Sequence, residues 1–420
     1  MQTTFARFAA LRGETAFRGV TSVCSAHPWV IEAALEQAKA DGGTALIEAT
    51  CNQVNQEGGY TGLRPADFRD LVWSLADRVG LARDRVVLGG DHLGPNPWKS
   101  LPAEAAMDRA LAMVESYARA GFTKLHLDCS MGCAGEPAAL GDSVVAGRAA
   151  RLAARAEAVA PGATVYVIGT EVPTPGGATE GLDHLVPTAP EAVLETHAVH
   201  ERAFREAAPS AWERVIAMVV QPGVEFGHED VAIFRPEAAA ALSATLRRLP
   251  GLVFEAHSTD YQPGQALREL VRSGYPILKV GPGLSFALRE TLYGLDAIAA
   301  ILSPGGDRLF DAMEGLMLAR PQQWRSHYAG TPDEQRVLRH FSYSDRIRYY
   351  WPEPEAVAAV AALEQKLAGR TIPPTLLSQY LPRLAERVAD GLVDATPKSL
   401  AIEAVRDVLR VYAGACNGAI

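Results

Sequence analysis

The stretch VVLGGDHLGP, residues Val86–Pro95, shows the pattern on which the fold prediction rests. Three apolar residues lead into two glycines and then into the adjacent pair Asp91-His92. A short apolar run that ends in glycine and ionisable residues is typical of a buried parallel strand with functional groups at its C-terminal end. Glycine there lets the backbone approach a ligand closely. Asp91-His92 could alternatively cap the next helix.

The same pattern recurs along the chain. Short apolar runs alternate with segments of helical periodicity, and each run ends in small or ionisable residues. The runs cover residues 19–24, 45–47, 86–88, 122–127, 164–169, 215–220, 252–254 and 277–280. Alternation of this kind implies right-handed βαβ units and a parallel sheet, and eight units favour an α/β fold of the (β/α)8 TIM-barrel type. An open dinucleotide-binding sheet is disfavoured because no GxGxxG follows the first run, and the absence of a Walker A loop argues against a kinase.

The domain prediction divides the chain after the eighth run. Residues 1–285 form the TIM-barrel domain, and residues 286–420 form a C-terminal helical extension packed on the barrel. No stretch between them has the composition of a flexible linker. The extension contains a dense aromatic and basic run, residues 343–351.

Composition restricts the class of protein. The chain has 420 residues, a net charge of -9 and a hydrophobic share of 48%, which favours a large core and disfavours nucleic-acid partners. No apolar run approaches the ~18 residues of a membrane span, and the N-terminus lacks the apolar core of a signal peptide. Five cysteines, an odd count in a long chain, fit a reducing cytoplasm better than a disulfide framework.

The active site of such barrels is built from residues that follow the strands. We expect carboxylates and imidazoles to line the C-terminal opening of the barrel, where their negative charge needs a compensating cation. A divalent metal, Zn²⁺ or Mn²⁺, is the simplest such cation. We expect His92 and His257 to be ligands, while Glu171 could bind either the metal or a substrate hydroxyl. The strand-end residues are His27, Glu48, Asp91, His92, Asp128, Glu171, Gln221, Glu225, Glu255, His257, Asp260 and Lys279.

Other candidates have two interpretations. His27 precedes a proline, so it could belong to the site or merely cap or orient the segment that follows. His126 is expected to be structural. Lys279 could neutralise Glu255 or bind a phosphate. The amides of residues 281–283 could bind phosphate or merely form a turn. Arg346 and Arg348 could bind phosphate or pack against aromatic rings.

At these residues the chain resembles the GatZ/KbaZ family, the subunit of class II D-tagatose-1,6-bisphosphate aldolase described as non-catalytic. The resemblance covers nearly the whole chain. Its motifs are SVCSAHP (22–28), IEATCNQVNQEGGYTG (47–62), GGDHLGPNPW (89–98), LHLDCSMGCAGEP (125–137), IGTEVPTPGG (168–177), VVQPGVEFGHE (219–229), FEAHSTDYQ (254–262), LKVGP (278–282), SYSDRIRYYWP (342–352) and LLSQYLP (376–382).

The resemblance implies one of two functions. Some relatives are 4-epimerases of D-tagatose and D-fructose or of their 6-phosphates, and others stabilise a separate catalytic aldolase subunit. The expected function is a metal-dependent ketose or ketose-phosphate 4-epimerase that cleaves and re-forms the C3–C4 bond, with an accessory aldolase subunit as the alternative. We expect the protein to be cytoplasmic and, by default, to form a homo-oligomer.

For the epimerase, each candidate residue receives a role. Asp91 is the first choice as acid/base, with Asp128 or Glu255 as its partner. The metal ligands are His92, Glu171 and His257. The expected substrate-binding residues are His27, Glu48, Gln221, Ser258, Asp260, Lys279, Arg346 and Arg348.

Overall fold

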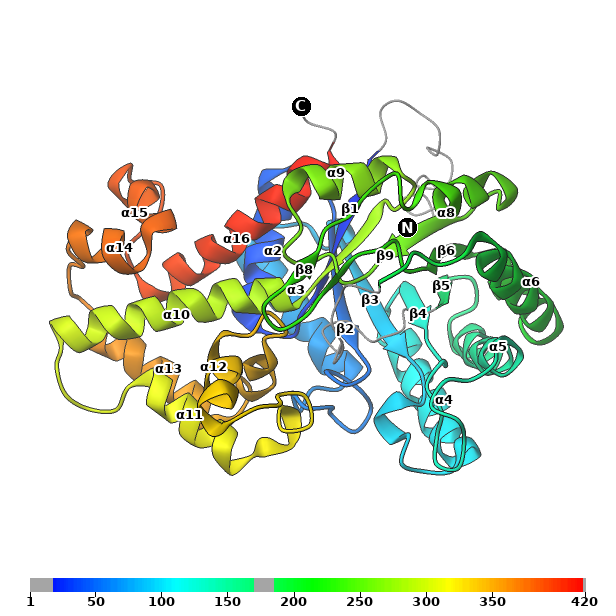
Figure 1. Ribbon diagram of the computed structural model, residues 1–420, viewed down its shortest axis with the longest axis horizontal. Coiled ribbons are helices and arrows are strands. Elements are labelled where there is room, and N and C mark those ends of the chain that lie inside the picture. The colour runs from blue at the N-terminus through cyan, green and yellow to red at the C-terminus, as the bar shows by residue number, and fades with distance from the viewer. Residues whose placement is uncertain (1–17, 170–184, 418–420) are drawn as a thin grey trace.

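Eight parallel strands close into a barrel in the computed structural model, which describes residues 18–169 and 185–417 (Figure 1). Around the barrel the order is β1-β10-β9-β6-β5-β4-β3-β2. Each barrel strand therefore pairs with the barrel strands before and after it along the chain, and the first and last strands, β1 and β10, close the barrel. The strands are β1 Val20–Cys24, β2 Ala45–Thr50, β3 Val86–Leu93, β4 Lys124–Leu127, β5 Val165–Gly169, β6 Val215–Val219, β9 Val253–Ala256 and β10 Ile277–Val280. The predicted (β/α)8 TIM barrel is confirmed.

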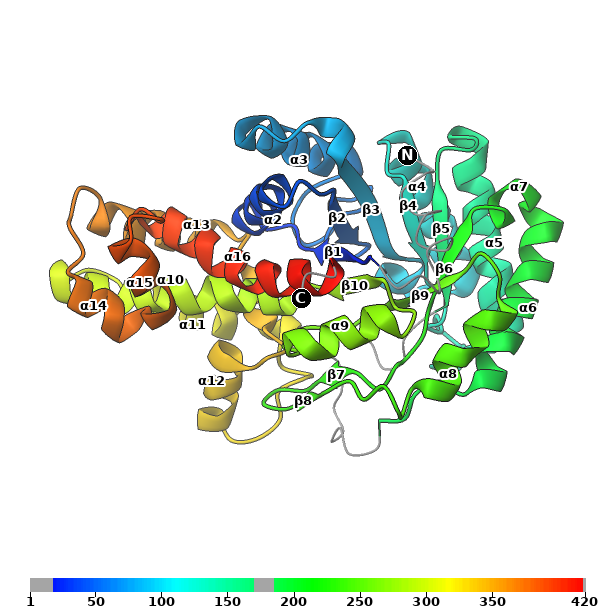
Figure 2. The ribbon, with the colours of Figure 1, turned by 90° about the horizontal axis from the view of Figure 1, so that it is seen from above.

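Helices cover the outside of the barrel (Figure 2). Most begin at a proline, which suits the first helical turn because its missing N–H would be unsatisfied there anyway. The helices that follow the strands are α2 Pro28–Ala40, α3 Pro65–Val79, α4 Ala103–Arg119, α5 Asp142–Val159, α6 Pro190–Ala207, α7 Pro209–Trp212, α8 Ala240–Ala244, α9 Gly264–Arg272 and α10 Pro282–Leu302. A small antiparallel pair, β7 Glu225–Phe226 and β8 Val231–Ala232, lies between β6 and α8.

The chain after α10 is helical, as expected. Its elements are α11 Leu309–Ala319, α12 Pro332–Phe341, the short 3₁₀ helix η6 Arg346–Tyr350, α13 Pro354–Leu367, α14 Pro374–Tyr380, α15 Pro382–Ala389 and α16 Pro397–Cys416. Helices α11–α15 lie to one side of the barrel, whereas α16 returns to it and packs against α2, α9 and α10 (Figure 2). The amide of Gly19 donates to the Cys416 carbonyl at 2.8 Å, which ties α16 to the start of β1. The apolar core is therefore continuous across residue 285; the division into two domains there stays a prediction.

Strand β4 shows how the barrel interior is built. Leu125 and Leu127 point outward into the core beneath the helices, while Lys124 and His126 alternate with them and are fully buried inside the barrel. Other residues inside the barrel form a separate apolar cluster, for example Val87, Val167 and Val253. The barrel interior thus combines an apolar cluster with a few buried polar groups, and the site lies where Asp91 and His92 come near the C-terminal end of β3.

The two glycines of the opening stretch make room for protein side chains. A Cβ added at Gly89 would lie 2.4 Å from Glu48 Oε1, and one at Gly90 would lie 2.8 Å from a ring carbon of Tyr117. Instead of admitting a ligand, as expected from the sequence, these glycines admit a buried carboxylate and an aromatic ring, so their function is packing within the barrel.

Candidate functional site

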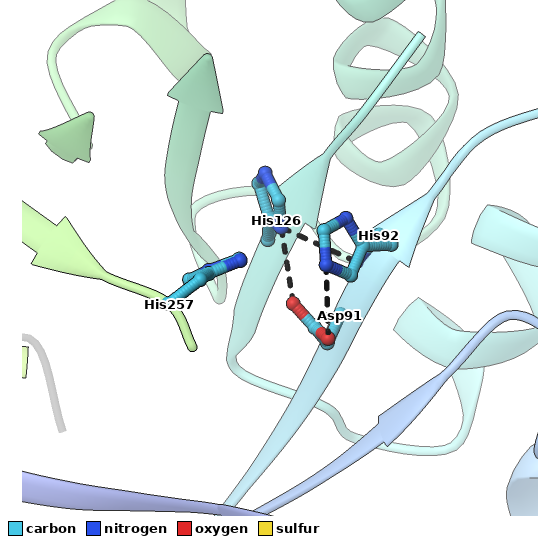
Figure 3. Close-up of side chains that lie close together, drawn as sticks. All are labelled: Asp91, His92, His126 and His257. Carbon is cyan, nitrogen blue, oxygen red and sulfur yellow. Dashed lines mark hydrogen bonds and ion pairs between the residues drawn. The ribbon is translucent and has the colours of Figure 1, made fainter. Parts of the chain in front are cut away.

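Three histidine rings and one carboxylate meet at the C-terminal end of the barrel (Figure 3). Asp91 and His92 end strand β3, His126 belongs to β4, and His257 directly follows β9. One ligand atom from each of the four lies within 4.8 Å of the others, and the ring centroids are 4.9–5.2 Å apart. The structure thus brings together His92 and His257, as predicted, with His126 as a third ring.

His126 was expected to be structural because it faces away from Leu125 and Leu127. Side chains along β4 do alternate between two faces, as predicted. The face opposite the leucines is the barrel interior, so the His126 side chain points into the site. Glu171, the third expected ligand, lies outside the described residues, and its role stays a prediction.

Each ring has one nitrogen beside an oxygen acceptor. A hydrogen bond of this kind fixes the tautomer, because the bonded nitrogen carries the hydrogen and the other keeps its lone pair. The pairs are His92 Nδ1–Asp128 Oδ2 at 2.9 Å, His257 Nε2–Glu255 Oε1 at 3.0 Å and His126 Nε2–Gly169 O at 2.9 Å. A cation in this cluster would be bound through the other nitrogens, His92 Nε2, His126 Nδ1 and His257 Nδ1.

The contact between His126 and Asp91 places an imidazole nitrogen close to a carboxylate oxygen. His126 Nδ1 lies 3.0 Å from Asp91 Oδ1 and accepts a hydrogen bond from the His92 backbone amide at 3.2 Å. When Nε2 donates to Gly169, a neutral His126 ring has no hydrogen left between Nδ1 and the carboxylate. The His92 N–H is directed at the Nδ1 lone pair, and a proton or a metal cation beside the carboxylate would offset the remaining repulsion between Nδ1 and Oδ1. This donor set fits a divalent cation with nitrogen and oxygen ligands.

Burial keeps two of the rings neutral, as metal ligands must be. It lowers the pKa of His92, and it lowers the pKa of His257 well below the usual value, with Lys279 adding to the effect at His257. The opposite holds for His126, where hydrogen bonding and charge attraction from Asp91 outweigh burial and raise the pKa.

Asp91 is held by several neighbours. Its Oδ2 forms an ion pair with Lys279 Nζ and accepts from Cys24 Sγ at 3.6 Å. Burial alone would raise the pKa of the Asp91 carboxyl, but the Lys279 ammonium and the hydrogen bond with His126 hold it well below its usual range. Asp91 is thus an ionised carboxylate whose direct neighbours are cationic or donate hydrogen bonds.

A second charged layer lies next to the histidines. Lys124 Nζ lies 2.7 Å from Glu48 Oε1 and 2.8 Å from Glu255 Oε2, and all three side chains are fully buried. Ser22 donates to Glu48 at 2.6 Å. Burial would lower the pKa of Lys124, but the two carboxylates raise it above its usual value. Glu48 and Glu255, expected to bind substrate and to catalyse, are therefore bound to Lys124, and Glu255 also holds His257.

A cavity of about 130 Å³ opens above this cluster. It brings together six of the predicted site residues. These are His92, Asp128, Ser258, Asp260, Lys279 and Arg348. A larger, mostly apolar cavity of about 460 Å³ adjoins it and shares Cys24, Gln53, Tyr60, Gly281 and Arg348.

Four predicted substrate-binding residues do not line the cavity above the cluster: Glu48, which is bound to Lys124, and His27, Gln221 and Arg346. His27 caps α2, since its Nδ1 accepts from the Trp29 amide at 3.2 Å, and it lines the larger cavity. Gln221 Oε1 accepts from the amides of residues 223 and 224 at 2.8 Å. Arg346 donates through Nε to the Gln323 carbonyl in the extension.

Asp260 occupies the place expected for a substrate phosphate. Its Oδ1 accepts from the amides of Gly281 and Gly283 at 3.0 and 2.7 Å, at the start of α10. Burial nevertheless raises the pKa of Asp260 to about 6. The two amides that the sequence analysis offered to a phosphate are thus already bonded, and their partner is a carboxylate of the chain itself.

The comparisons with known proteins agree with one another over nearly the whole chain. A family model described as D-tagatose-1,6-bisphosphate aldolase subunit GatZ/KbaZ-like matches residues 6–417. A D-tagatose 6-phosphate 4-epimerase of Agrobacterium fabrum is 54% identical over 401 residues, covering 94% of both chains. A crystal structure from Sinorhizobium meliloti 1021, described as a probable tagatose 6 phosphate kinase, is 56% identical with a TM-score of 0.89 and covers 95% of this chain and 100% of its own.

Proposed function

This chain belongs to the GatZ/KbaZ-like family of D-tagatose-1,6-bisphosphate aldolase subunits, and we propose that it is itself a metal-dependent 4-epimerase of D-tagatose 6-phosphate and D-fructose 6-phosphate. The named activity of the Agrobacterium relative supports the substrate pair. The observation that carries the proposal is the cluster of three rings, each held by its own oxygen partner, at the edge of a cavity. A protein that only stabilised another subunit would not need this arrangement.

The chemistry follows from the position of the inverted carbon. C4 is not adjacent to the C2 carbonyl, so simple enolisation cannot invert it. Loss of the C4 hydroxyl proton can instead break the C3–C4 bond, giving an aldehyde and an enediolate. After the aldehyde turns over, re-forming the bond gives the other epimer.

The residues of the site supply binding and proton transfer. A divalent cation, Zn²⁺ or Mn²⁺, would be held by His92, His126 and His257 and would stabilise the negative charge that develops at C2 and C3. Asp91 takes the proton from the C4 hydroxyl, with Lys279 beside it to bind the same oxygen. Asp128 and Glu255 act through the rings that they orient, a role that fits their hydrogen bonds better than direct acid/base catalysis.

The family description favours a second candidate, an accessory subunit of a catalytic aldolase. Both candidates share the expectation of a cytoplasmic protein. All five cysteines are free and buried, which fits a reducing compartment. Within residues 18–169 and 185–417, no helix combines the length and the apolar character that crossing a membrane requires.

Removal of the metal tests the proposed function. The purified chain is expected to convert D-tagatose 6-phosphate into D-fructose 6-phosphate, and chelation should lower the rate by about 10³-fold, since bound metals contribute several kcal/mol to such transition states. Adding Zn²⁺ or Mn²⁺ should restore the rate. Conversion would be followed by chromatography of the two epimers. A chain that converts neither epimer with either cation, but activates a partner's aldolase, would establish the accessory role instead.

A further inference from the structure

Tyr349 lines the cavity above the histidine cluster. It belongs to η6, and with Arg348 it is one of two cavity-lining residues that come from the chain beyond α10. The other described residues of that cavity come from the barrel, its loops or the start of α10. Its ring packs edge-to-face against Tyr60, which follows β2, with centroids 4.9 Å apart. Tyr349 therefore approaches the cavity from a wall that the barrel strands do not form.

Two arginines surround the Tyr349 phenol. Arg348 Nη2 donates to the Tyr349 oxygen at 3.0 Å, so the hydroxyl proton remains for another acceptor. The guanidinium carbons of Arg348 and Arg346 lie 4.5 and 4.9 Å from the ring centroid. Although burial and the Cys24 thiol oppose it, the two arginines lower the pKa of Tyr349 below its usual value.

The proposed reaction needs proton transfer at two positions. Turning the aldehyde over moves its oxygen by about 2 Å, since a carbonyl bond is about 1.23 Å long. An O–H···O hydrogen bond spans only about 2.5–3.0 Å, so a group placed for the oxygen before the turn is misplaced after it. An aldolase needs one such group, whereas a 4-epimerase needs a second.

We propose that Tyr349 is this second acid/base group, exchanging a proton with the C4 oxygen on the face opposite to the one that Asp91 serves. The inference rests on the proposed function, since it assigns a role within that reaction. It explains why η6, far from β3 in the sequence, places a phenol and its paired arginine in the same cavity as His92 and Lys279. The extension thereby contributes a catalytic residue to the barrel.

The protons balance over one turnover. In one direction Asp91 accepts the C4 hydroxyl proton while the electrons of the C3–C4 bond move into the enediolate. After the aldehyde turns, C3 attacks C4, and the new alkoxide takes the proton of Tyr349. Water exchanging into the cavity returns a proton to Tyr349 and removes one from Asp91, so no other reactant is consumed.

The test is Tyr349→Phe, which removes only the hydroxyl. Epimerisation should fall about 10²–10⁴-fold, the usual contribution of general acid–base catalysis. The matched control is Tyr350→Phe, because the neighbouring hydroxyl donates to the Arg320 carbonyl outside the cavity. This control should keep the wild-type rate.

A second readout separates catalysis from structure. Supplied with dihydroxyacetone and glyceraldehyde 3-phosphate, the wild type should form both C4 epimers, whereas Tyr349→Phe should form predominantly one. Equal loss of both epimers, or an unchanged rate, would overturn the role of Tyr349 while leaving the proposed function intact. A wild-type chain that neither epimerises nor condenses would overturn the proposed function and this inference with it.

Discussion

Replacing His92 with asparagine is expected to remove the bound cation and to lower the epimerisation rate by at least about 10³-fold, because a metal supplies several kcal/mol of transition-state stabilisation. Asparagine is chosen because His92 has φ 48°, a left-handed conformation that asparagine tolerates better than alanine. Metal content by atomic emission and initial rates with D-tagatose 6-phosphate are the two measurements. The metal content and the epimerisation rate should fall together, because the substitution removes the imidazole ring but leaves the barrel folded.

The control for this substitution is His197→Asn. His197 lies on α6 against Trp212, outside the cluster, with ring centroids 5.2 Å apart. This variant should keep both its cation and its rate. A His92→Asn chain that binds one cation per chain and epimerises within tenfold of the wild type would contradict the assignment of His92.

The second large effect is on stability. Replacing Lys124 with methionine leaves the Glu48 and Glu255 carboxylates buried without their cation. Breaking a buried ion pair in this way typically costs about 3–5 kcal/mol. We expect a loss of this size in the free energy of unfolding at pH 8, measured by urea denaturation. The surface variant Lys398→Met, which breaks a half-exposed pair with Glu32, should cost less than about 1 kcal/mol.

The loss of stability in Lys124→Met is expected to depend on pH. Without Lys124, burial raises the folded-state pKa of the Glu48 carboxyl further above the unfolded value of about 4.3, so protonation of Glu48 favours the folded variant. The difference from the wild type should therefore be largest near pH 8 and shrink as the pH falls toward about 5. Adding Glu48→Gln to Lys124→Met should recover part of the loss. A single variant within about 1 kcal/mol of the wild type at pH 8 would show that the three groups are not a charged network.

The barrel could be predicted from the sequence because each strand carries its own local signal. Runs such as Val86–Leu88 end in glycine or ionisable residues, and eight of them with intervening helices leave few alternative folds. Strand ends in a parallel barrel share one rim, so the meeting of His92 with His257 followed from topology alone.

What the sequence did not reveal depends on side chains that meet only in three dimensions. The alternation in Lys124–Leu127 identified two faces, but it could not say that the one carrying His126 faces the site. Nothing local shows that Asp260 bonds the amides of α10, because its partners lie more than 20 residues away. Tyr349 gave only a compositional signal, as part of an aromatic and basic run whose docking onto the barrel is a tertiary property.

The central claim is that three histidine rings hold one divalent cation at the mouth of the barrel. Anomalous diffraction, recorded on both sides of the absorption edge from crystals grown with Zn²⁺, tests it most directly. The account predicts a single peak about 2.1 Å from one nitrogen of each of His92, His126 and His257. A peak elsewhere, or one bound by only a single ring of the three, would contradict it.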